Sequence, residues 1–339
     1  MYVSIVLAVL IHYAVGKLPP VDLSHYGTSL YRKIDPNVDK LIRNLDHSLG
    51  IQPWELGSLV ESDMRLPLPK LRNGLRTNSS NSFVRWPNAT LIYQIEGHFN
   101  KTELGFIFGA MREFEKYTCI RFRERTDEKA YVSIGNTDYG CWADVGRGEG
   151  KTVLNLQPGC ANALVTPIHE MMHSLGFYHE HNRPDRDDYV EVRFDYMYPD
   201  PPIYFNFMVE EDSDVTNFSV PYDLGSIMHY TKYAFSAKPG KLETLAPLVP
   251  WHGDLGQRET FTKYDVLLIN IMYCGTPEPT EPLPVPDRWT PAEPLMHNAR
   301  PKRSTTLRKV IKRRPTSGKM TKETRERMEQ QLRGECSRK

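Results

Sequence analysis

The spacing of apolar and polar residues predicts strands and a helix in the first half of the globular part of the chain. Apolar residues alternate with polar ones from Thr90 to Ile95 and again from Ala130 to Ile134, so both stretches are predicted to be β-strands. Between them, Glu103 to Tyr117 has helical spacing. Strands with a helix between them predict an α+β architecture for this half.

The second half shows less periodicity. Helical spacing extends from Asn162 to Phe177, whereas the chain from there to Cys274 is rich in Pro, Asp, Tyr and Gly. We therefore expect one more helix and then a mostly irregular region. Prolines recur from Pro277 to Pro294, which predicts an extended linker over residues 276 to 296.

The first sixteen residues predict a signal peptide. An apolar run from Val3 to Val15, interrupted by a serine and a histidine, ends with the small residues Ala14 and Gly16. A membrane-spanning helix needs about 20 apolar residues, so we expect cleavage after Gly16 and secretion, with no membrane span. Residues 17 to 72 show only short helical patterns, such as Val38 to Leu49, and no core of their own.

Composition and charge separate the body of the chain from its tail. The 339 residues are 40% hydrophobic, which excludes a wholly disordered chain. Residues 297 to 339 carry 15 Lys or Arg against 4 Glu, which leaves 28 basic and 38 acidic residues elsewhere. We expect this tail to be disordered: it is either a solvated charge run or a binder of polyanions such as sulfated glycans. The sequence RPKR, ending at Arg303, is a candidate site for its removal, and nucleic acid is not an expected partner.

Cysteines and glycosylation sequons agree with secretion. Four of the five cysteines are expected to pair within the domain, and sequence alone permits three pairings of the four. Cys336 in the tail is left over and is a candidate for cross-linking two chains. Four Asn-x-Ser/Thr sequons provide glycosylation candidates at Asn78, Asn88, Asn100 and Asn217.

One segment combines histidines at the spacing of a metal site. His169 and His173 are four residues apart, so both project from one helix face toward one ion. Glu170 lies about 100° round the helix, beside the metal and not bound to it. On a continuous helix His179 would lie roughly 240° from His173, so the helix must end before it. Gly176 suits that reversal because glycine readily adopts positive φ.

These three histidines predict a catalytic zinc site. Three protein ligands leave the fourth position of a tetrahedral Zn²⁺ open for water, whose pKa falls to about 7 while the ion polarises the scissile carbonyl. Glu170 is the expected general base that takes the proton of the zinc-bound water. The alternative is a helix with ordinary histidines, which the extended pattern through Gly176 and His179 disfavours.

Further sequence islands accompany this motif. They are RWPN from Arg85, YTCIRF around Cys119, GCWADVG around Cys141, HEMMHSLGFYHEHNRPDRDDYV from His169 and SIMHY from Ser226. Together they resemble the astacin family of zinc endopeptidases from about residue 73 to residue 275. The resemblance implies a two-lobed metzincin domain with a twisted upper sheet, an active-site helix, an irregular lower lobe and a cleft that holds one zinc ion.

The resemblance also implies roles for individual residues. Met228 would form a turn beneath the zinc, and Tyr230 would be an extra ligand that swings away to hydrogen-bond the oxyanion in the transition state. Glu180, which follows the third histidine, would anchor the amino terminus of the mature enzyme. Two disulfides are implied, Cys119 to Cys274 and Cys141 to Cys160.

Relatives in this family keep the zymogen inactive with an aspartate on the zinc, in the pattern Phe, any residue, Gly, Asp. Here Val60, Glu61, Ser62 and Asp63 fill the pattern, with Val in place of Phe and Ser in place of Gly. Asp63 is therefore the candidate zymogen switch, and an exposed loop acid is the alternative.

The expected function is a secreted zinc endopeptidase made as a zymogen. Arg72 precedes a stretch that resembles the start of mature astacins and suits a trypsin-like activating protease, with Arg76 as the second candidate. Residues 17 to 72 would form the inhibitory pro-segment. Extended segments of extracellular proteins are the expected substrates, lying along the edge of the upper sheet. The alternative is a catalytically silent secreted binding protein that uses the protease fold and the basic tail, which Glu170 disfavours.

Overall fold

The computed structural model describes residues 35–66, 85–198, 203, 205–210, 217–256 and 259–276. The predicted signal peptide, the activation sites at Arg72 and Arg76, the sequon at Asn78, the linker and the basic tail with Cys336 lie outside the described residues. Within the described residues, no helix is both long and apolar enough to cross a membrane.

A six-stranded sheet forms the upper part of the fold, in the order β1-β5-β6-β4-β2-β3. The neighbouring strands are parallel except for β5, which is antiparallel to β6. The predictions for residues 90–95 and 130–134 correspond to β2 and β4, respectively. The strands are β1 (Met64–Arg65), β2 (Thr90–Ile95), β3 (Arg121–Glu124), β4 (Tyr131–Gly135), β5 (Cys141–Asp144) and β6 (Lys151–Leu156).

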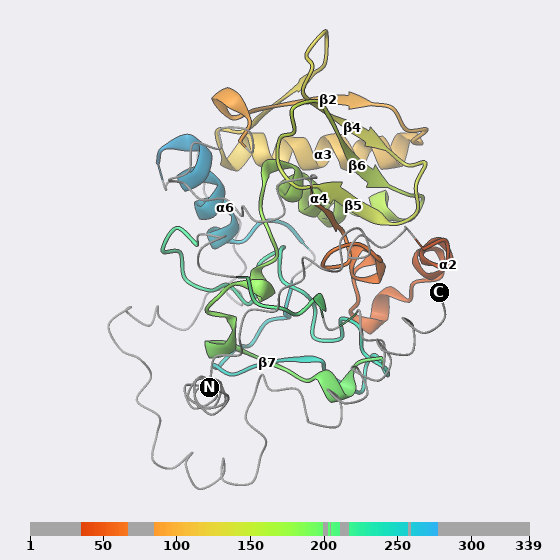
Figure 1. Ribbon diagram of the computed structural model, residues 1–339, viewed down its shortest axis with the longest axis vertical. Helices are drawn as coiled ribbons and strands as arrows, with labels where there is room; N and C mark the ends of the chain where they lie inside the picture. Colours follow the sequence, from red (N-terminus) through yellow and green to blue (C-terminus); the bar gives the residue numbers. More distant parts are fainter. Residues whose placement is uncertain are drawn as a thin grey trace, which may run out of the picture. The chain divides into compact units, whose positions relative to one another are not determined.

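Two helices pack beside this sheet, α3 (Lys101–Tyr117) and α4 (Val165–Leu175), and they contact each other (Figure 1). The α3 helix begins at Asn100, whose Oδ1 accepts hydrogen bonds from the backbone N–H groups of Thr102 and Glu103. The Glu103 carboxylate in turn accepts from the Asn100 N–H, which completes a capping box. Both helices bury apolar side chains in the core that also covers the sheet.

The N-terminal segment, defined here as residues 35–66, contributes to the same core. Its helix α2 (Asn37–Arg43) buries Val38 and Ile42, and Trp54 lies deeper along the segment at 1% exposure. These three side chains pack with those of the sheet and of α3 and α4. The segment therefore has no separate core within its described part, as its sequence pattern predicts. Two short 3₁₀ helices follow α2, His47–Leu49 and Pro53–Leu56.

The lower part is mostly irregular, as predicted, and has its own hydrophobic core. Its two-stranded antiparallel sheet joins β7 (Val190–Val192) to β8 (Leu245–Pro247). The second core includes Phe207, Tyr230 and Leu245. Two cores, one beneath the sheet and one in the irregular part, make this an α+β, two-lobed fold. Short 3₁₀ helices lie at Pro87–Ala89, Cys160–Asn162, Glu180–Asn182, Arg186–Asp188 and Phe194–Tyr196.

Two disulfides tie distant parts of the upper lobe together. The chain returns to this lobe through α6 (Lys263–Ile269), which continues as a π-helix over Asn270–Cys274. Cys119, just after α3, is bonded to Cys274, and the two Cα atoms are 5.6 Å apart. Cys141 on β5 is bonded to Cys160 with a Cα separation of 5.7 Å. These pairings are the ones that the family resemblance implies.

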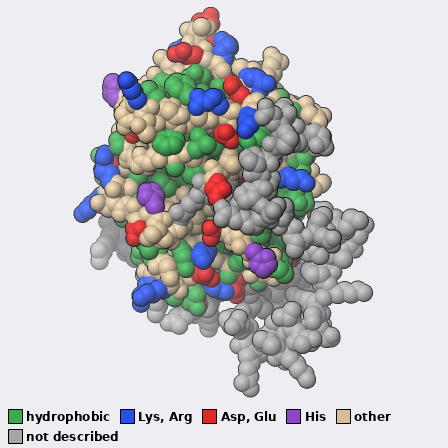
Figure 2. Space-filling model, turned by 180° about the vertical axis from the view of Figure 1, so that it is seen from behind, with side chains coloured by type: hydrophobic (Ala, Val, Ile, Leu, Met, Phe, Trp, Pro, Cys, Tyr) green, Lys and Arg blue, Asp and Glu red, His purple; other side chains and the backbone are tan. Residues whose placement is uncertain are grey.

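One face of the described residues mixes charges of both signs. On the face drawn in Figure 2, acidic and basic side chains lie among apolar ones and do not gather by sign.

Candidate metal centre

Helix α4 carries the first two histidines of the motif, and the chain reverses its direction after the helix ends. His169 and His173 lie one turn apart and both are fully buried. The helix ends at Leu175, and Gly176 follows with φ of 107°. Its N–H donates to the carbonyls of Met172 and His173, which closes the last turn of the helix. The chain then turns back to His179, as the spacing of the motif predicts.

Four buried side chains converge at this point: Asp63, His169, His173 and His179. Each offers one ligand atom, and the four atoms lie within 4.8 Å of one another. An oxygen of Asp63 lies 3.0 Å from Nε2 of His169, and its other oxygen lies 3.3 Å from Nε2 of His179. The Nε2 atoms of His169 and His173 are 3.1 Å apart. The N-terminal segment thus brings a carboxylate into contact with all three histidines of the motif.

The outer nitrogens of the histidines fix the orientation of the rings. Nδ1 of His169 donates to the carbonyl of Ile227 at 2.8 Å, and Nδ1 of His173 donates to that of Phe177 at 2.7 Å. A carbonyl oxygen can only accept, so Nδ1 of each of these two rings carries a proton, and the Nε2 atoms are the ones left to face the cluster. Nδ1 of His179 lies 2.7 Å from a carboxylate oxygen of Glu61. All three rings therefore turn Nε2 toward the centre of the cluster.

This arrangement fits a zinc ion. Burial lowers the pKa of His169 to about 4, so its ring is neutral and the lone pair on its Nε2 points into the buried cluster, 3.1 Å from Nε2 of His173. Nε2 of His179 and Oδ1 of Asp63 are buried and have no hydrogen-bond partner among the described residues. A cation between these atoms relieves both problems, and three imidazoles with one carboxylate form a donor set that zinc prefers.

The charges around the cluster follow from its burial. Burial raises the pKa of Asp63, but the three histidines outweigh it and lower the pKa well below its ordinary value, so the carboxylate is ionised. Burial lowers the pKa of His179, whereas the carboxylates of Asp63 and Glu61 raise it, with a net result of about 10. In the protein alone a proton therefore competes with a metal ion for the position at Nε2 of His179.

Glu170 lies on α4 next to the cluster and makes no compensating contact. Its side chain is fully buried, and neither carboxylate oxygen has a hydrogen-bond partner among the described residues. Burial, followed by the charge of Asp63, raises the pKa of Glu170 well above its ordinary value. The residue can therefore hold a proton close to the metal position.

Tyr230 is buried beside the cluster and is held by the N-terminal segment. Its hydroxyl donates to the carbonyl of Glu61 at 2.6 Å and lies 2.9 Å from Oγ of Ser62. Burial raises the pKa of Tyr230 well above 10, so the phenol keeps its proton. Its ring stacks on His181 with the centroids 3.7 Å apart.

Met228 lies in the bend that passes beneath the histidines. Its side chain is buried in the upper core, and its carbonyl accepts a hydrogen bond from the N–H of Glu180 at 2.9 Å. The carbonyl of the preceding residue, Ile227, accepts from His169. The bend thus supports the imidazole ring of His169 and the backbone just after His179.

The turn that carries Asp63 forms without the glycine of the family pattern. Glu61 and Ser62 take positive φ values of 46° and 72°, and Ser62 exchanges backbone hydrogen bonds with Leu59 at 3.0 and 3.1 Å. Space for the turn comes from Gly57, where a Cβ atom would lie 2.0 Å from the carbonyl oxygen of Ser62. Serine in place of glycine therefore does not prevent a tight turn here.

The N-terminal segment makes two further contacts that the sequence did not reveal. The Trp54 ring stacks on His169 with centroids 4.3 Å apart. The Glu55 carboxylate is buried and accepts hydrogen bonds from the backbone N–H and the hydroxyl of Thr231. The sequence signal for these residues is weak, because a single Trp-Glu pair matches no spacing that predicts contact with a distant motif.

Glu180 lies in a buried polar network next to a cavity. Its Oε1 accepts from Nη1 of Arg183 at 3.0 Å and from the N–H of Asp223 at 2.8 Å. Burial raises the pKa of Glu180 to about 7, against the opposing charge of Arg183. The adjoining cavity has a volume of about 300 Å³ and is also lined by Gly176 and Phe218.

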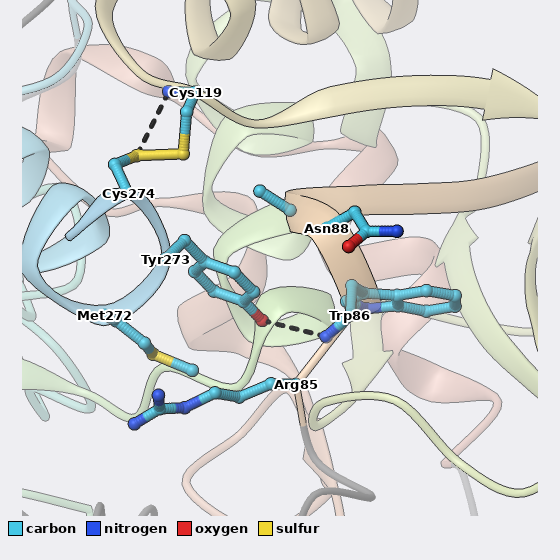
Figure 3. A pocket seen from close by; sticks show the side chains of 8 residues that line it. Arg85, Trp86, Asn88, Cys119, Met272, Tyr273 and Cys274 are labelled. Carbon is cyan, nitrogen blue, oxygen red and sulfur yellow. Dashed lines mark hydrogen bonds between the residues drawn. A yellow bond between two sulfur atoms is a disulfide. The ribbon is translucent and has the colours of Figure 1, made fainter.

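The described sequons differ in accessibility. Asn88 is exposed and has φ of 54°, and its side chain lines a separate cavity of about 430 Å³ between Trp86 and Tyr273 (Figure 3). Asn100 is exposed, with its oxygen engaged in capping α3. Asn217 is half-buried and accepts from the N–H of Ser219. The cavity in Figure 3 contains none of the four residues of the metal cluster.

A known peptidase family matches the same part of the chain. The family model of astacin, a peptidase family, matches residues 78–274. The chain belongs to the astacin family. Zinc is accordingly its metal cofactor, and the cluster of Asp63 with three histidines is where the described residues fit one ion.

Individual astacins resemble the chain over its central part. Zinc metalloproteinase nas-7 of Caenorhabditis elegans is 38% identical over 222 residues, which cover 65% of this chain and 55% of the relative. Zinc metalloproteinase nas-8 of Steinernema carpocapsae is 39% identical over 212 residues, 61% of this chain and 49% of the relative. The chain thus spans about half the length of these two relatives.

A solved astacin structure shares the fold. High choriolytic enzyme 1, a hatching enzyme zinc-protease from Oryzias latipes, is 32% identical and superposes with a TM-score of 0.54. The match covers 60% of this chain and 99% of the solved chain. The two-lobed arrangement described above is therefore that of an astacin protease domain.

Proposed function

We propose that the protein is a secreted zinc endopeptidase, made as an inactive zymogen, that hydrolyses peptide bonds of extracellular proteins. One observation carries the proposal: three buried imidazoles turn Nε2 toward a common point, and the unpartnered carboxyl group of Glu170 lies beside it. A zinc ion at that point supplies Lewis acidity, which polarises a peptide carbonyl and makes bound water acidic. The match to the astacin family supports the same function.

Glu170 is the proposed general base. Its raised pKa, caused by burial and by the charge of Asp63, falls once Asp63 leaves, because the neighbouring anion is then gone. The freed carboxylate takes a proton from the attacking water and passes it to the nitrogen of the leaving amine. Both oxygens are unpartnered among the described residues, so no competing hydrogen bond has to break first.

Tyr230 is the proposed oxyanion donor. Its phenol keeps its proton, and in the structure that proton is donated to the Glu61 carbonyl. Removal of the N-terminal segment frees the hydroxyl, which can then donate to the oxygen of the tetrahedral intermediate. His169, His173 and His179 are the proposed zinc ligands, with their Nδ1 hydrogen bonds holding the rings in place.

Asp63 is the proposed zymogen switch. A zinc ion held by the three histidines would have one position left for water, and the ionised Asp63 carboxylate, which lies among the same three rings, would fill it instead. We infer that residues 17–72 are an inhibitory pro-segment, and that a trypsin-like protease removes it by cutting near Arg72. Glu180 then receives the new amino terminus, since its buried carboxyl group borders a cavity.

Secretion fits the two disulfides, and polyanion binding by the tail stays a sequence-based prediction.

The test replaces Glu170 in the activated protein. Glu170→Ala should reduce cleavage of a casein substrate by at least about 10²-fold, because general base catalysis contributes about 10²- to 10⁴-fold. Zinc content, measured by atomic absorption, should remain one ion per chain. Glu124→Ala, at an exposed position on β3, is the matched control and should retain full activity. Equal activity of Glu170→Ala and the unmodified protein contradicts the mechanism, and no activity in the unmodified protein favours the silent binding protein.

A further inference from the structure

We propose that Asp144 and Trp142 on β5 form a substrate subsite for an arginine or lysine side chain, which Arg65 fills in the zymogen. This inference rests on the proposed peptidase function and adds a substrate preference to it. The sequence alone assigns no preference at any subsite.

The backbone of the N-terminal segment occupies the outer edge of the sheet. Its strand β1 pairs with β5, and the N–H groups of Ala143 and Val145 donate to the carbonyls of Asp63 and Arg65 at 3.0 and 3.1 Å. When β1 departs, these two donors lose their acceptors and β5 becomes the edge strand. An extended substrate peptide can pair with this edge as an added strand and supply new acceptors for the two N–H groups.

The Arg65 side chain occupies a built site on that edge. Its guanidinium forms a forked pair with Asp144, in which Nη2 lies 2.6 Å from Oδ2 and Nε contacts Oδ1. The same guanidinium lies 4.5 Å from the centre of the Trp142 ring, at cation–π distance. The Trp142 ring and the Asp144 carboxylate are both flat. Together they suit the flat, charged guanidinium group of arginine better than they suit any uncharged side chain.

The Asp144 carboxylate is fixed independently of Arg65. Its side chain is 11% exposed, and Oδ2 also accepts a hydrogen bond from the N–H of Val153 on β6 at 2.7 Å. This contact remains when the N-terminal segment leaves. The subsite is therefore preorganised, and a substrate cation does not have to order it.

The local charge selects a cation. The Asp144 carboxylate forms an ion pair with the Arg65 guanidinium, and Asp138 adds a second, weaker negative charge. Both carboxylates thus favour a positive charge at this position. An acidic substrate side chain placed there would face two like charges, which provides selection against it.

The subsite lies close to the reaction centre. Arg65 follows Asp63 by two residues, which in an extended strand is a distance of roughly 6.6 Å. Asp63 marks the metal position, because its carboxylate lies among the three histidines. A substrate side chain that replaces Arg65 therefore belongs to a residue within about two positions of the scissile bond, on the side that pairs with β5.

The test uses pairs of peptide substrates that differ at one position, with arginine in one and the isosteric, uncharged citrulline in the other. The activated protein should cleave the arginine peptide about 10- to 100-fold more efficiently in kcat/KM, the range expected for a charge-assisted forked contact. Asp144→Asn should abolish this preference, because kcat/KM for the arginine peptide falls to that for the citrulline peptide. Asp127→Asn, at an exposed position, is the control and should keep the preference. A preference absent from the unmodified protein, or retained by Asp144→Asn, overturns the proposal.

A binding measurement separates this proposal from the peptidase proposal. Activated Glu170→Ala protein is titrated with labelled peptides of residues 51–66 that carry arginine or citrulline at position 65. The arginine peptide should bind at least about tenfold more tightly, and Asp144→Asn should remove the difference. Equal binding of the two peptides contradicts the subsite even if the enzyme is active. A binding difference, together with no turnover of any peptide by the activated protein that retains Glu170, supports the subsite and contradicts the peptidase function.

Discussion

At the scale of single residues, Glu61 links two parts of the site. Its side chain accepts a hydrogen bond from Nδ1 of His179 at 2.7 Å, and its backbone carbonyl accepts from the hydroxyl of Tyr230 at 2.6 Å. The carboxylate is 4% exposed, so water screens the contact with His179 poorly. Glu61 therefore holds the third ligand candidate and the oxyanion candidate in their present positions.

Removal of the Glu61 carboxylate should destabilise the uncut chain. Glu61→Ala leaves the buried Nδ1–H group of His179 without its acceptor, so the free energy of unfolding should fall by about 2 kcal/mol. Urea denaturation monitored by tryptophan fluorescence measures this loss. The matched control is Glu149→Ala at an exposed position, which should change the free energy by less than about 0.5 kcal/mol. Equal stabilities of the two variants would show that the contact with His179 does not hold the segment.

At the scale of elements, two glycines decide where side chains of the cluster lie. Gly176 allows α4 to end with φ of 107°, which directs the chain back toward the metal position and to His179. Gly57 permits the close approach of the turn that carries Asp63. The first was predictable because it lies inside a motif whose spacing demands a reversal. The second was not, because its partner Ser62 is identified only by the folded turn.

A methyl group at Gly57 should disturb the turn that carries Asp63, the proposed zymogen switch. In Gly57→Ala the new Cβ would meet the Ser62 carbonyl oxygen at 2.0 Å, so the turn must shift and Asp63 with it. The uncut chain should then cleave a fluorogenic peptide measurably above the level of the unmodified chain. Gly105→Ala on α3 is the control, since nothing lies within 4 Å of its Cβ, and it should stabilise the helix by about 0.5 to 1 kcal/mol. Unchanged latency of Gly57→Ala would show that the turn has room to relax.

The elements also show why the sequence predicted some strands and not others. β2 and the helices α3 and α4 have local periodicity, so their positions followed from spacing. β5 is buried along its whole length and does not alternate, whereas β3 is mostly exposed at the far edge of the sheet. The contact between Glu55 and Thr231 joins residues 176 positions apart. No local sequence pattern predicts such a contact. The contacts that the N-terminal segment makes around the site could therefore be identified only from the structure.

At the scale of the molecule, the metal position connects the two cores. The segment that contains Met228 and Tyr230 contributes the first residue to the upper core and the second to the lower core. His169 and His173 come from a helix of the upper core, and Asp63 comes from the N-terminal segment. An ion that binds all of these elements cross-links parts of the chain that are distant in sequence.

Removal of the metal should therefore lower the stability of the whole uncut chain. Without a cation, the ligand atoms of Asp63 and the three histidines are left buried within 4.8 Å of one another, with no ion to bind them together. Dialysis against a chelator should lower the Tm by several degrees, and one equivalent of Zn²⁺ should restore it. The same treatment of His173→Ala should have little effect, because a ligand is already missing. An unchanged Tm after verified zinc loss would indicate that the cluster is held together without the ion.

The uncut chain should hold one zinc ion between Asp63 and three histidines. Anomalous diffraction from crystals of the uncut chain, recorded on both sides of the zinc absorption edge, tests it most directly. We predict a single strong peak in contact with Asp63, His169, His173 and His179. A peak elsewhere, or a zinc ion bound by the histidines with Asp63 turned away, would contradict the account.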